Sequence, residues 1–517
     1  MARKIHCLLV ITFILSGCAS LPDNSMRTES FAVTDTRETT LGRGLQASRD
    51  SGETRDGFIL LDKGLDAFVA RAALAEAAEK SLDVQYYLYH DDLIGGLFTA
   101  TLLRAADRGV RVRLLVDDMD MENRDRSILA IDNHPNVEIR IFNPFNRSMS
   151  RLPQFVTGLG SITRRMHNKS FTADNVATIL GGRNIGNEYF DANPTLEFAD
   201  LDVLAIGDVV KDVSTSFDLY WNSPLTYPAK TLIDKPISDE EALNARNQLH
   251  AFFEEQKNSD YMQSLKSSAL AKSIREDSIE FFLGNAVIVV DHPDKITHSR
   301  DTNKLHLVSQ LAPYFQNIKQ ELIIISPYFV PGDEGVDFFK ALLDKGIQVR
   351  ILTNSLSSND VGIVHSGYAK YREALLRSGV ALYEMNKKLT RKQRKEKKGV
   401  ASSSKASLHA KAFILDREKI FIGSLNLDPR SFYENTEIGL VLNSTEVASA
   451  MAKVLIEEIE KYAFRLELHI NTEGEEEIRW HGYENGRAVT FDVDPYTSFW
   501  RRLGVAFMSL LPIESQL

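Results

Sequence analysis

Two segments of the sequence carry the same spacing of a histidine, a lysine and an aspartate, H-x-K-x-x-x-x-D. With 12 histidines in the chain, only about 0.05 matches to this spacing are expected by chance. Two matches therefore indicate a duplicated functional motif. The six motif residues are the candidate catalytic residues: His167, Lys169 and Asp174 in the first segment, and His409, Lys411 and Asp416 in the second.

The motif spacing predicts a site for a phosphodiester. A histidine and a lysine two residues apart on a strand project from the same face, so two motifs supply two imidazoles and two ammonium groups. Ammonium groups neutralise phosphate oxygens, and imidazoles act as nucleophile or proton donor near neutral pH. Lysines repel cations, so we expect no metal and no other cofactor. Asn184 and Asn426 follow the motifs after glycine-containing steps and can donate hydrogen bonds to phosphate oxygens.

The elements that must position these residues also occur twice. Each half reads as a buried strand, an amphipathic helix ended by a glycine, and a second strand, and Val110 and Ile347 begin the second strands 237 residues apart. This repeat predicts an α/β fold of two pseudo-symmetric α/β/α halves, with mixed, mostly parallel sheets that share one active site. The segments are 82–89, 93–109 and 110–118, then 322–330, 337–346 and 347–355.

The chain divides into six predicted segments. We interpret them as a signal peptide (1–17), a flexible tether after a lipidated Cys18 (18–57), the first half (58–229), a helical connector (230–303), the second half (304–465), and C-terminal strands with an amphipathic helix (466–517).

Composition excludes several classes of protein. Hydrophobic residues at 43% and charged residues at 26% of 517 match a soluble globular chain, which excludes a multi-span membrane protein and a disordered one. A net charge of -10 is not that of a general nucleic-acid binder. Cys7 and Cys18 are the two cysteines of the chain, so no disulfide framework or cysteine zinc site is expected.

The N-terminus predicts export and a lipid anchor. Arg3 and Lys4 precede an apolar run, residues 5–15, that suits a secretory signal, and Leu15-Ser16-Gly17-Cys18 resembles the bacterial lipobox. A lipidated Cys18 predicts a bacterial cell envelope protein that faces the periplasm. By resemblance to Gram-negative lipoproteins, Ala19 rather than an aspartate after the cysteine favours the outer membrane. The alternative is an ordinary signal peptide with an incidental cysteine.

The doubled motif resembles that of the phospholipase D superfamily. More narrowly, RRMHNKSFTADNVATILGGRNIG, LTNSLSSNDVGIVHSGYAKYR and TSFWRR look like segments of the bacterial class C cardiolipin synthases. The resemblance implies that His167 attacks phosphorus to form a phosphohistidine, while His409 is the acid and then the base. Lys169, Lys411, Asn184 and Asn426 would then cradle the phosphate, whereas Asp174 and Asp416 often support the motif in this superfamily.

The resemblance also implies a carboxylate partner for each histidine. Asp200 lies 33 residues after His167, and Glu437 lies 28 residues after His409. Each is expected to reach the opposite half, so that Glu437 orients His167 and Asp200 orients His409. Two surface carboxylates are the alternative.

The predicted function is phosphatidyl transfer between glycerophospholipids, yielding cardiolipin from two phospholipids. Hydrolysis to phosphatidic acid is the alternative, a nuclease is a further one, and a lipid-binding scaffold with an inactive site is the non-enzyme interpretation. We expect glycerophospholipids and a membrane surface as partners, no nucleic acid, and a monomer.

Three further sequence features each allow two interpretations. Residues 387–398 contain eight basic residues of twelve, which fits either a solvated loop or attraction to anionic lipid. Residues 498–512 pair Trp500 and two arginines with an apolar run, as an interfacial helix or a packed one does. Asp117 and Asp118 end a strand and favour a structural role over a metal site.

Overall fold

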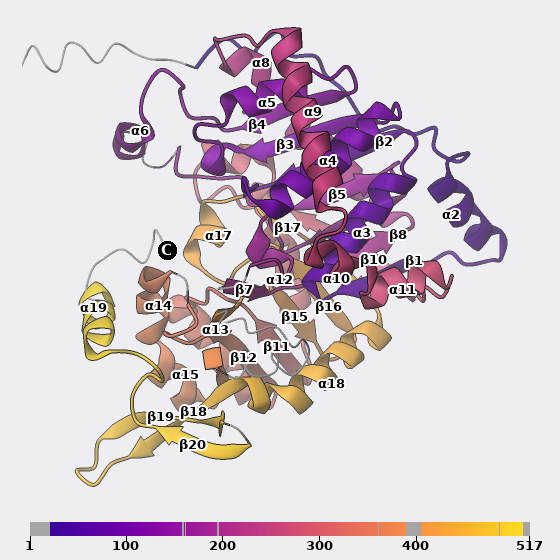
Figure 1. The fold of residues 1–517 in the computed structure, drawn as a ribbon. Coiled ribbons are helices and arrows are strands. Elements are labelled where there is room, and N and C mark those ends of the chain that lie inside the picture. The colour runs from indigo at the N-terminus through magenta and orange to yellow at the C-terminus, as the bar shows by residue number, and fades with distance from the viewer. Residues whose placement is uncertain are drawn as a thin grey trace, which may run out of the picture.

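The computed structural model describes residues 21–157, 160, 162–193, 196–359, 361–388, 405–484 and 486–509. The predicted signal peptide and Cys18 lie outside these residues, as do most of the basic stretch 387–398 and the last residues of the tail. In Figure 1 the first half lies at the top and the second half at the bottom.

The first half is built on one mixed sheet with the order β9-β4-β3-β2-β5-β6-β8-β1. Its parallel strands β2, β3 and β4 are joined by α4 (Leu93–Asp107) and α5 (Asp125–Asp132), and the predicted strand–helix–strand unit is confirmed. The strands are β1 (Asp56–Leu61), β2 (Ser81–Tyr86), β3 (Arg111–Asp117), β4 (Val137–Phe142), β5 (Ser170–Ala173), β6 (Ala177–Gly181), β8 (Asp202–Ile206) and β9 (Thr226–Pro228).

The second half repeats this arrangement and extends it. Its order is β10-β17-β16-β15-β11-β12-β13-β18-β19-β20, so the predicted C-terminal strands continue its sheet. The strands are β10 (Phe282–Val290), β11 (Glu321–Ile325), β12 (Gln348–Asn354), β13 (Ala381–Met385), β15 (Ala412–Leu415), β16 (Lys419–Gly423), β17 (Ile438–Asn443), β18 (Ala463–Ile470), β19 (Glu476–Glu484) and β20 (Arg487–Phe491).

Helices cover the outer faces of both sheets, and α4 and α13 end at glycines in the left-handed region, Gly109 and Gly346. The helices are α2 (Thr40–Asp50), α3 (Gly64–Ala77), α4 (Leu93–Asp107), α5 (Asp125–Asp132), α6 (Arg151–Thr157), α7 (Val209–Trp221), α8 (Ala229–Leu232), α9 (Asp239–Gln256), α10 (Asp260–Lys266), α11 (Ala269–Arg275), α12 (Leu307–Gln316), α13 (Gly332–Asp344), α14 (Gly362–Ala369), α15 (Arg372–Ser378), α17 (Pro429–Tyr433), α18 (Thr445–Tyr462) and α19 (Phe499–Ser509).

The expectation that the sheets are mostly parallel is wrong. In each main sheet the parallel pairs are confined to one set of three strands, β2-β3-β4 and β11-β12-β13. Each motif strand instead returns through a tight turn whose first two residues, Asp174-Asn175 and Asp416-Arg417, all have φ between 51° and 55°. Each turn leaves three residues between antiparallel strand ends, which pair as Ala173 with Ala177 and Leu415 with Lys419, so β5-β6 and β15-β16 are hairpins.

The connector joins the two sheets as well as the two halves. It contains the expected helices, but β10 pairs with β1 at Phe282–Gly284 and with β17 at Asn285–Val290. Both sheets, together with α7 and α18, also enclose a shared hydrophobic core that includes Leu180 and Val203 from the first half and Ile414 from the second. The halves are therefore held together as one structure.

The segment expected to be a flexible tether lies along the first half wherever the structure describes it. The Asn24 amide donates to the Thr226 carbonyl at 2.7 Å, and the Ala32 amide donates to the Asp218 carboxylate at 2.8 Å. Helix α2 follows, with its N-terminus capped by the Thr39 hydroxyl. The free tether of the prediction is thus a packed strap from residue 24 onward.

Candidate active site

Each half lends a backbone segment to the motif of the other half. The backbone N–H of His167 donates to the Thr436 carbonyl at 2.9 Å, and that of His409 donates to the Ala199 carbonyl at 2.8 Å. Beside the second contact, β14 (Lys405–Leu408) pairs in parallel with β7 (Leu196–Ala199). We call these two backbone contacts between the halves, at Thr436 and at Ala199, the clasps. They bring both motif histidines to the junction of the halves.

The clasps place one carboxylate on each imidazole. Glu437, next to Thr436, has its Oε2 2.8 Å from Nδ1 of His167, and Asp200, next to Ala199, has its Oδ2 2.6 Å from Nδ1 of His409. Both contacts expected from the sequence are therefore present, and both cross between the halves. A carboxylate that accepts from Nδ1–H leaves Nε2 as the nitrogen available for chemistry.

Aromatic rings hold the imidazoles in place. Tyr87 packs edge-on against His167 at 4.9 Å between ring centroids, and His409 lies against Tyr189 and Phe198 at 5.2 and 5.0 Å. Sequence analysis missed these three residues, because an aromatic residue in an apolar strand or loop gives no signal that distinguishes a site wall from a core. Their contacts limit ring rotation and exclude water.

The motif lysines lie beside their histidines. The ammonium of Lys169 donates to the His167 carbonyl at 2.5 Å, and that of Lys411 donates to the His409 carbonyl at 2.6 Å and lies about 3 Å from the His409 ring nitrogens. Both side chains are almost completely buried. Burial lowers the pKa of Lys169 to about 7, against the opposing effect of Glu437.

Burial also sets the charge of the histidines. It lowers the pKa of His167 well below its ordinary value, with further lowering by Lys169 and Lys411. The pKa of His409 is lowered by burial and by Lys411, but Asp200 opposes both effects. His167 is therefore neutral at neutral pH, as a nucleophile must be.

The two carboxylates have different environments. Burial raises the pKa of Glu437 to about 7, although Lys169 and a hydrogen bond from the Ser424 hydroxyl oppose it. Burial also acts to raise the pKa of Asp200. The charges of His409 and Lys411 and the hydrogen bond from His409 outweigh burial and hold this pKa well below its usual range. Asp200 is thus ionised at neutral pH, whereas Glu437 gains or loses its proton near neutral pH.

A second ion pair supports Glu437 from behind. The Asp291 carboxylate accepts from the backbone N–H of Glu437 at 2.8 Å and from the Lys295 ammonium at 2.9 Å. Burial raises the pKa of Asp291 to about 6, against the opposing effect of Lys295. Sequence analysis missed this pair, since two charged residues four apart in a polar stretch resemble a solvated surface pair.

The side-chain amides of Asn184 and Asn426 differ in their hydrogen bonds. Asn184 donates to the Tyr189 hydroxyl at 2.9 Å and accepts from the Leu88 N–H at 3.2 Å, so it braces the wall around His409 rather than presenting an unengaged amide. The amide oxygen of Asn426 has no hydrogen-bond partner among the residues described. An amide oxygen accepts hydrogen bonds and so does not bind a phosphate oxygen, and phosphate binding by Asn184 and Asn426 therefore remains a prediction.

Placing Asp174 and Asp416 among the catalytic residues is not supported by the geometry. Each lies at the hairpin turn, at the far end of a four-residue strand from its motif histidine. The Asp174 carboxylate accepts from three consecutive backbone N–H groups, those of residues 79–81, and Asp416 accepts from those of residues 319–321. Both carboxylates hold a turn against the start of the neighbouring strand.

The acidic pair at the end of β3 has a structural role, as the sequence favoured. Asp117 accepts from Arg165 at 3.1 Å and from the Met166 N–H at 2.9 Å, and Asp118 pairs with Arg147. Asp117 thereby fixes the backbone just before His167. Across the described part of the chain, no group of three or more His, Cys, Asp or Glu residues is arranged to hold a metal ion.

Two related halves that each contribute a His-x-Lys pair, with each histidine met by a carboxylate of the other half, define a phospholipase D-like protein. Comparison with known families narrows this class. Residues 71–221 and 311–459 match the family described as "Cardiolipin synthase, PLD-like domain". The chain belongs to this cardiolipin synthase family.

Relatives extend along nearly the whole chain. It is 39% identical over 459 residues to cardiolipin synthase C of Escherichia coli, covering 89% of this chain and 95% of that protein. It is 31% identical over 519 residues to an uncharacterised Helicobacter pylori protein, covering 98% and 99%. Among solved structures, phosphatidylserine synthase of Haemophilus influenzae is 15% identical with a TM-score of 0.54, covering 82% of this chain and 92% of that one, which shows a shared fold.

Proposed function

We propose that this protein transfers a phosphatidyl group from one glycerophospholipid to a hydroxyl of a second, and that it forms cardiolipin when the acceptor is phosphatidylglycerol. The relative named cardiolipin synthase C supports this reaction. The observation that carries the proposal is the reciprocal pair of contacts, Glu437 to His167 and Asp200 to His409. One site thus holds two oriented imidazoles, as a reaction with two proton transfers needs.

In the first step, Nε2 of His167 attacks phosphorus, and the bond from phosphorus to the headgroup oxygen breaks. His409 gives its proton to the departing oxygen, so the products are a phosphohistidine and a free alcohol. Ionised Asp200 stabilises the protonated form of His409 that this step requires. Lys169 and Lys411 offset the charge on the phosphate oxygens.

In the second step, the acceptor hydroxyl attacks phosphorus, and His409 takes its proton. The bond between phosphorus and Nε2 of His167 breaks, which restores the neutral imidazole and releases the new phosphodiester. Water in place of the acceptor gives phosphatidic acid by the same route. The aromatic walls around both histidines disfavour water and so support transfer.

The test is incubation of detergent-solubilised protein with phosphatidylglycerol, followed by mass spectrometry of the lipids. Cardiolipin is the expected product, and His167→Ala and His409→Ala should abolish it. Phosphatidic acid as the main product would show a hydrolase instead, and degradation of a plasmid without lipid turnover would show a nuclease. Phospholipid labelled at phosphorus should also leave an acid-labile, alkali-stable adduct that is absent in His167→Ala.

We also propose that the protein is a bacterial lipoprotein anchored through Cys18 and facing the periplasm, with the outer membrane favoured by Ala19. The lipobox-like segment supports this location. No helix in the described ranges is long and apolar enough to cross a bilayer. Cys18→Ala should abolish labelling by radioactive palmitate, and retained labelling would contradict the anchor.

Exposed apolar side chains further support a membrane surface as partner. Trp500 and Phe507 of α19 are 75% and 65% exposed, and Leu152 of α6 is 75% exposed. Both helices project at the left edge of Figure 1. Helix α6 leads from β4 to the first motif, and α19 packs on α14, which follows β12. Helix α6 therefore belongs to a loop at the carboxyl end of a parallel strand, where the site also lies, and α19 packs against another such loop. We propose a monomer, since one chain supplies both histidines and both carboxylates.

A further inference from the structure

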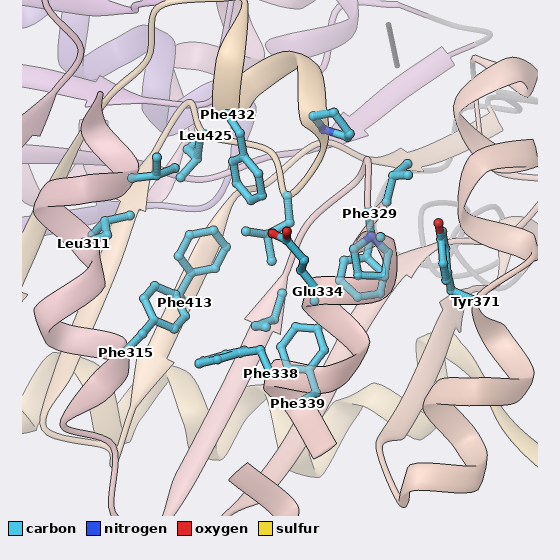
Figure 2. Close-up of a pocket in the computed structure, with 18 of the residues that line it drawn as sticks. Leu311, Phe315, Phe329, Glu334, Phe338, Phe339, Tyr371, Phe413, Leu425 and Phe432 are labelled. Atoms are coloured by element: carbon cyan, nitrogen blue, oxygen red, sulfur yellow. The ribbon is translucent and has the colours of Figure 1, made fainter. Parts of the chain in front are cut away.

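The second half contains a large apolar pocket that the proposed mechanism does not use. It lies between α12, α13, α17 and the outer face of the sheet and has a volume of about 620 Å³. Figure 2 shows Phe315, Phe338, Phe413 and Phe432 around it, with Glu334 among them. This volume is within the range of ligand pockets, about 300–1,000 Å³. We refer to it as the α12–α13 pocket.

The first half shows that the fold itself does not require this pocket. When α4 and α13 are aligned on their terminal glycines, Phe98 corresponds to Gly335, which lines the pocket. Phe98 is buried, and its ring lies 5.8 Å from that of Phe171. Phe171 corresponds to Phe413, since each lies four residues after its motif histidine. The space that an aromatic ring fills in the first half is therefore left open in the second.

The pocket shares a wall with the candidate phosphate site. Leu425 and Leu427 line the pocket, and Asn426 between them is not among the lining residues, as expected for alternating side chains of an extended segment. The preceding residue, Ser424, hydrogen-bonds the Glu437 carboxylate that contacts His167. Leu427 is itself held in place, because its carbonyl accepts from the Val330 N–H at 2.7 Å.

We propose that the α12–α13 pocket holds one acyl chain of the phospholipid whose phosphate lies at His167 and Asn426, an inference that rests on the proposed function. In a glycerophospholipid the phosphate ester is on one terminal glycerol carbon and the acyl esters are on the other two carbons, so a chain begins close enough to its phosphate for the two to lie on opposite sides of a thin wall. Aromatic and aliphatic side chains suit methylene groups.

The charge of the pocket distinguishes an esterified chain from a free fatty acid. Glu334 lines the pocket and is exposed, and Asp333 precedes it in the first turn of α13. Two carboxylates repel the carboxylate of a free fatty acid, but they do not repel an uncharged ester. The occupant we infer is therefore a chain that enters as part of a phospholipid.

The experiment fills the pocket and varies the chain length of the substrate. Ala312→Phe places a ring in the pocket from α12, and Ala341→Phe, on the exposed face of α13, is the matched control. We expect Ala312→Phe to lower kcat/KM for dioleoyl phosphatidylglycerol about tenfold or more, while the value for dihexanoyl phosphatidylglycerol stays within about twofold of wild type. An equal effect on both substrates, or no effect on either, would overturn the proposal.

A binding measurement separates this inference from the reaction. Inactive His167→Ala protein is irradiated with dioleoyl-type phosphatidylglycerol that carries a diazirine at mid-chain. Crosslinks to residues 307–316 and 425–433, which Ala312→Phe removes, support the pocket even if no transfer occurs. Crosslinks confined to other segments overturn it. Displacement of the probe by oleate at equal concentration would show a fatty-acid site, which also overturns it.

Discussion

The Glu437 carboxylate lies 2.8 Å from Nδ1 of His167, although the two residues are 270 positions apart and belong to different halves. Asp200 makes the reciprocal contact with His409 at 2.6 Å. Neither motif is therefore completed by its own half. The backbone contacts of Thr436 and Ala199 next to these carboxylates fix their reach, so the junction of the halves sets the geometry of catalysis.

Glu437→Gln tests this relationship directly. The amide oxygen can still accept from Nδ1–H, but it carries no charge to stabilise a positive imidazole as phosphorus is attacked. We expect formation of the phosphohistidine to slow by about 10²- to 10⁴-fold. Single-turnover labelling with rapid quenching measures this rate. Glu446→Gln, at an exposed position of α18, is the control and should match wild type. A Glu437→Gln rate within twofold of the control would contradict the role.

Much of the site was predictable from local sequence, because a repeated spacing survives in any alignment of the chain with itself. The two motifs and the strand–helix–strand units followed from that repeat. The clasps at Thr436 and Ala199 did not, since pairing between distant segments leaves no periodic signal in either one. The partners Asp200 and Glu437 came from family resemblance rather than from spacing, because they follow their motifs at different distances.

The direction of the strands was less predictable for a physical reason. Alternating strands and helices favour parallel sheets, but the hairpins at Asp174 and Asp416 depend on two consecutive left-handed residues. Aspartate, asparagine and arginine at these turns lack the glycine that signals such a hairpin. The pairing of strand β10 with both β1 and β17 also has no counterpart in local sequence.

The pH dependence of kcat/KM should be bell-shaped around neutrality. As the pH falls through about 7, Glu437 becomes protonated and no longer stabilises a positive His167, which gives the acidic limb. As the pH rises through about 7, Lys169 loses the charge that attracts phosphate, which gives the alkaline limb. Asp200 adds no limb there, because its pKa lies well below its usual range.

Lys169→Arg and Glu437→Gln separate the two limbs. Arginine stays charged, so Lys169→Arg should remove the alkaline limb, whereas Glu437→Gln should remove the acidic limb at a lower rate overall. The measurement is kcat/KM from about pH 5 to about pH 9 in detergent micelles. An alkaline limb unchanged in Lys169→Arg would show that another group, such as His409, controls it.

Asp174→Ala should destabilise the protein more than it slows the reaction. It removes the acceptor of three backbone N–H groups at residues 79–81 and leaves a left-handed residue with φ 51° at the turn. We expect the free energy of unfolding to fall by about 1–3 kcal/mol, with activity per folded molecule largely retained. Asp174→Asn should lose less, because asparagine accepts hydrogen bonds and tolerates this backbone.

Urea unfolding and active-site titration measure the two effects. The same substitution at Asp416 should behave alike, since Asp416 accepts from the N–H groups of residues 319–321. A hundredfold loss of kcat without a change in stability would restore a catalytic role to these aspartates.

Gly182 and Ser424 occupy matching positions in the two halves, Gly182 beside Asp200 and Ser424 beside Glu437. Substitution at each position should therefore change the carboxylate next to it. A Cβ at Gly182 would lie 2.1 Å from Oδ1 of Asp200, so Gly182→Ala must displace the carboxylate from His409. We expect about a tenfold or larger loss of kcat.

Ser424→Ala removes a hydrogen bond that lowers the pKa of Glu437, so the acidic limb of the pH profile should shift to higher pH. An unchanged limb would exclude that bond as a control of Glu437.

Helix α19 should bind lipid through its exposed apolar face. Trp500 and Phe507 lie seven residues apart on one side of the helix and are 75% and 65% exposed, and Arg501 and Arg502 directly follow Trp500. Replacing both aromatic residues with serine, in protein that lacks the anchor through Cys18→Ala, should weaken binding to phosphatidylglycerol vesicles about tenfold or more, because each apolar side chain contributes roughly 1.5–3 kcal/mol on burial.

The control for that experiment is Val454→Ser, at a position of α18 that is 58% exposed. Helix α18 lies at the lower right of Figure 1, away from α6 and α19. It should bind vesicles as the parent protein does in a sedimentation assay. Because the substitutions lie outside the catalytic residues, the double variant should keep its kcat on dihexanoyl phosphatidylglycerol in solution. Equal loss of binding in Val454→Ser would mean that general surface hydrophobicity, rather than α19, holds the protein on the membrane.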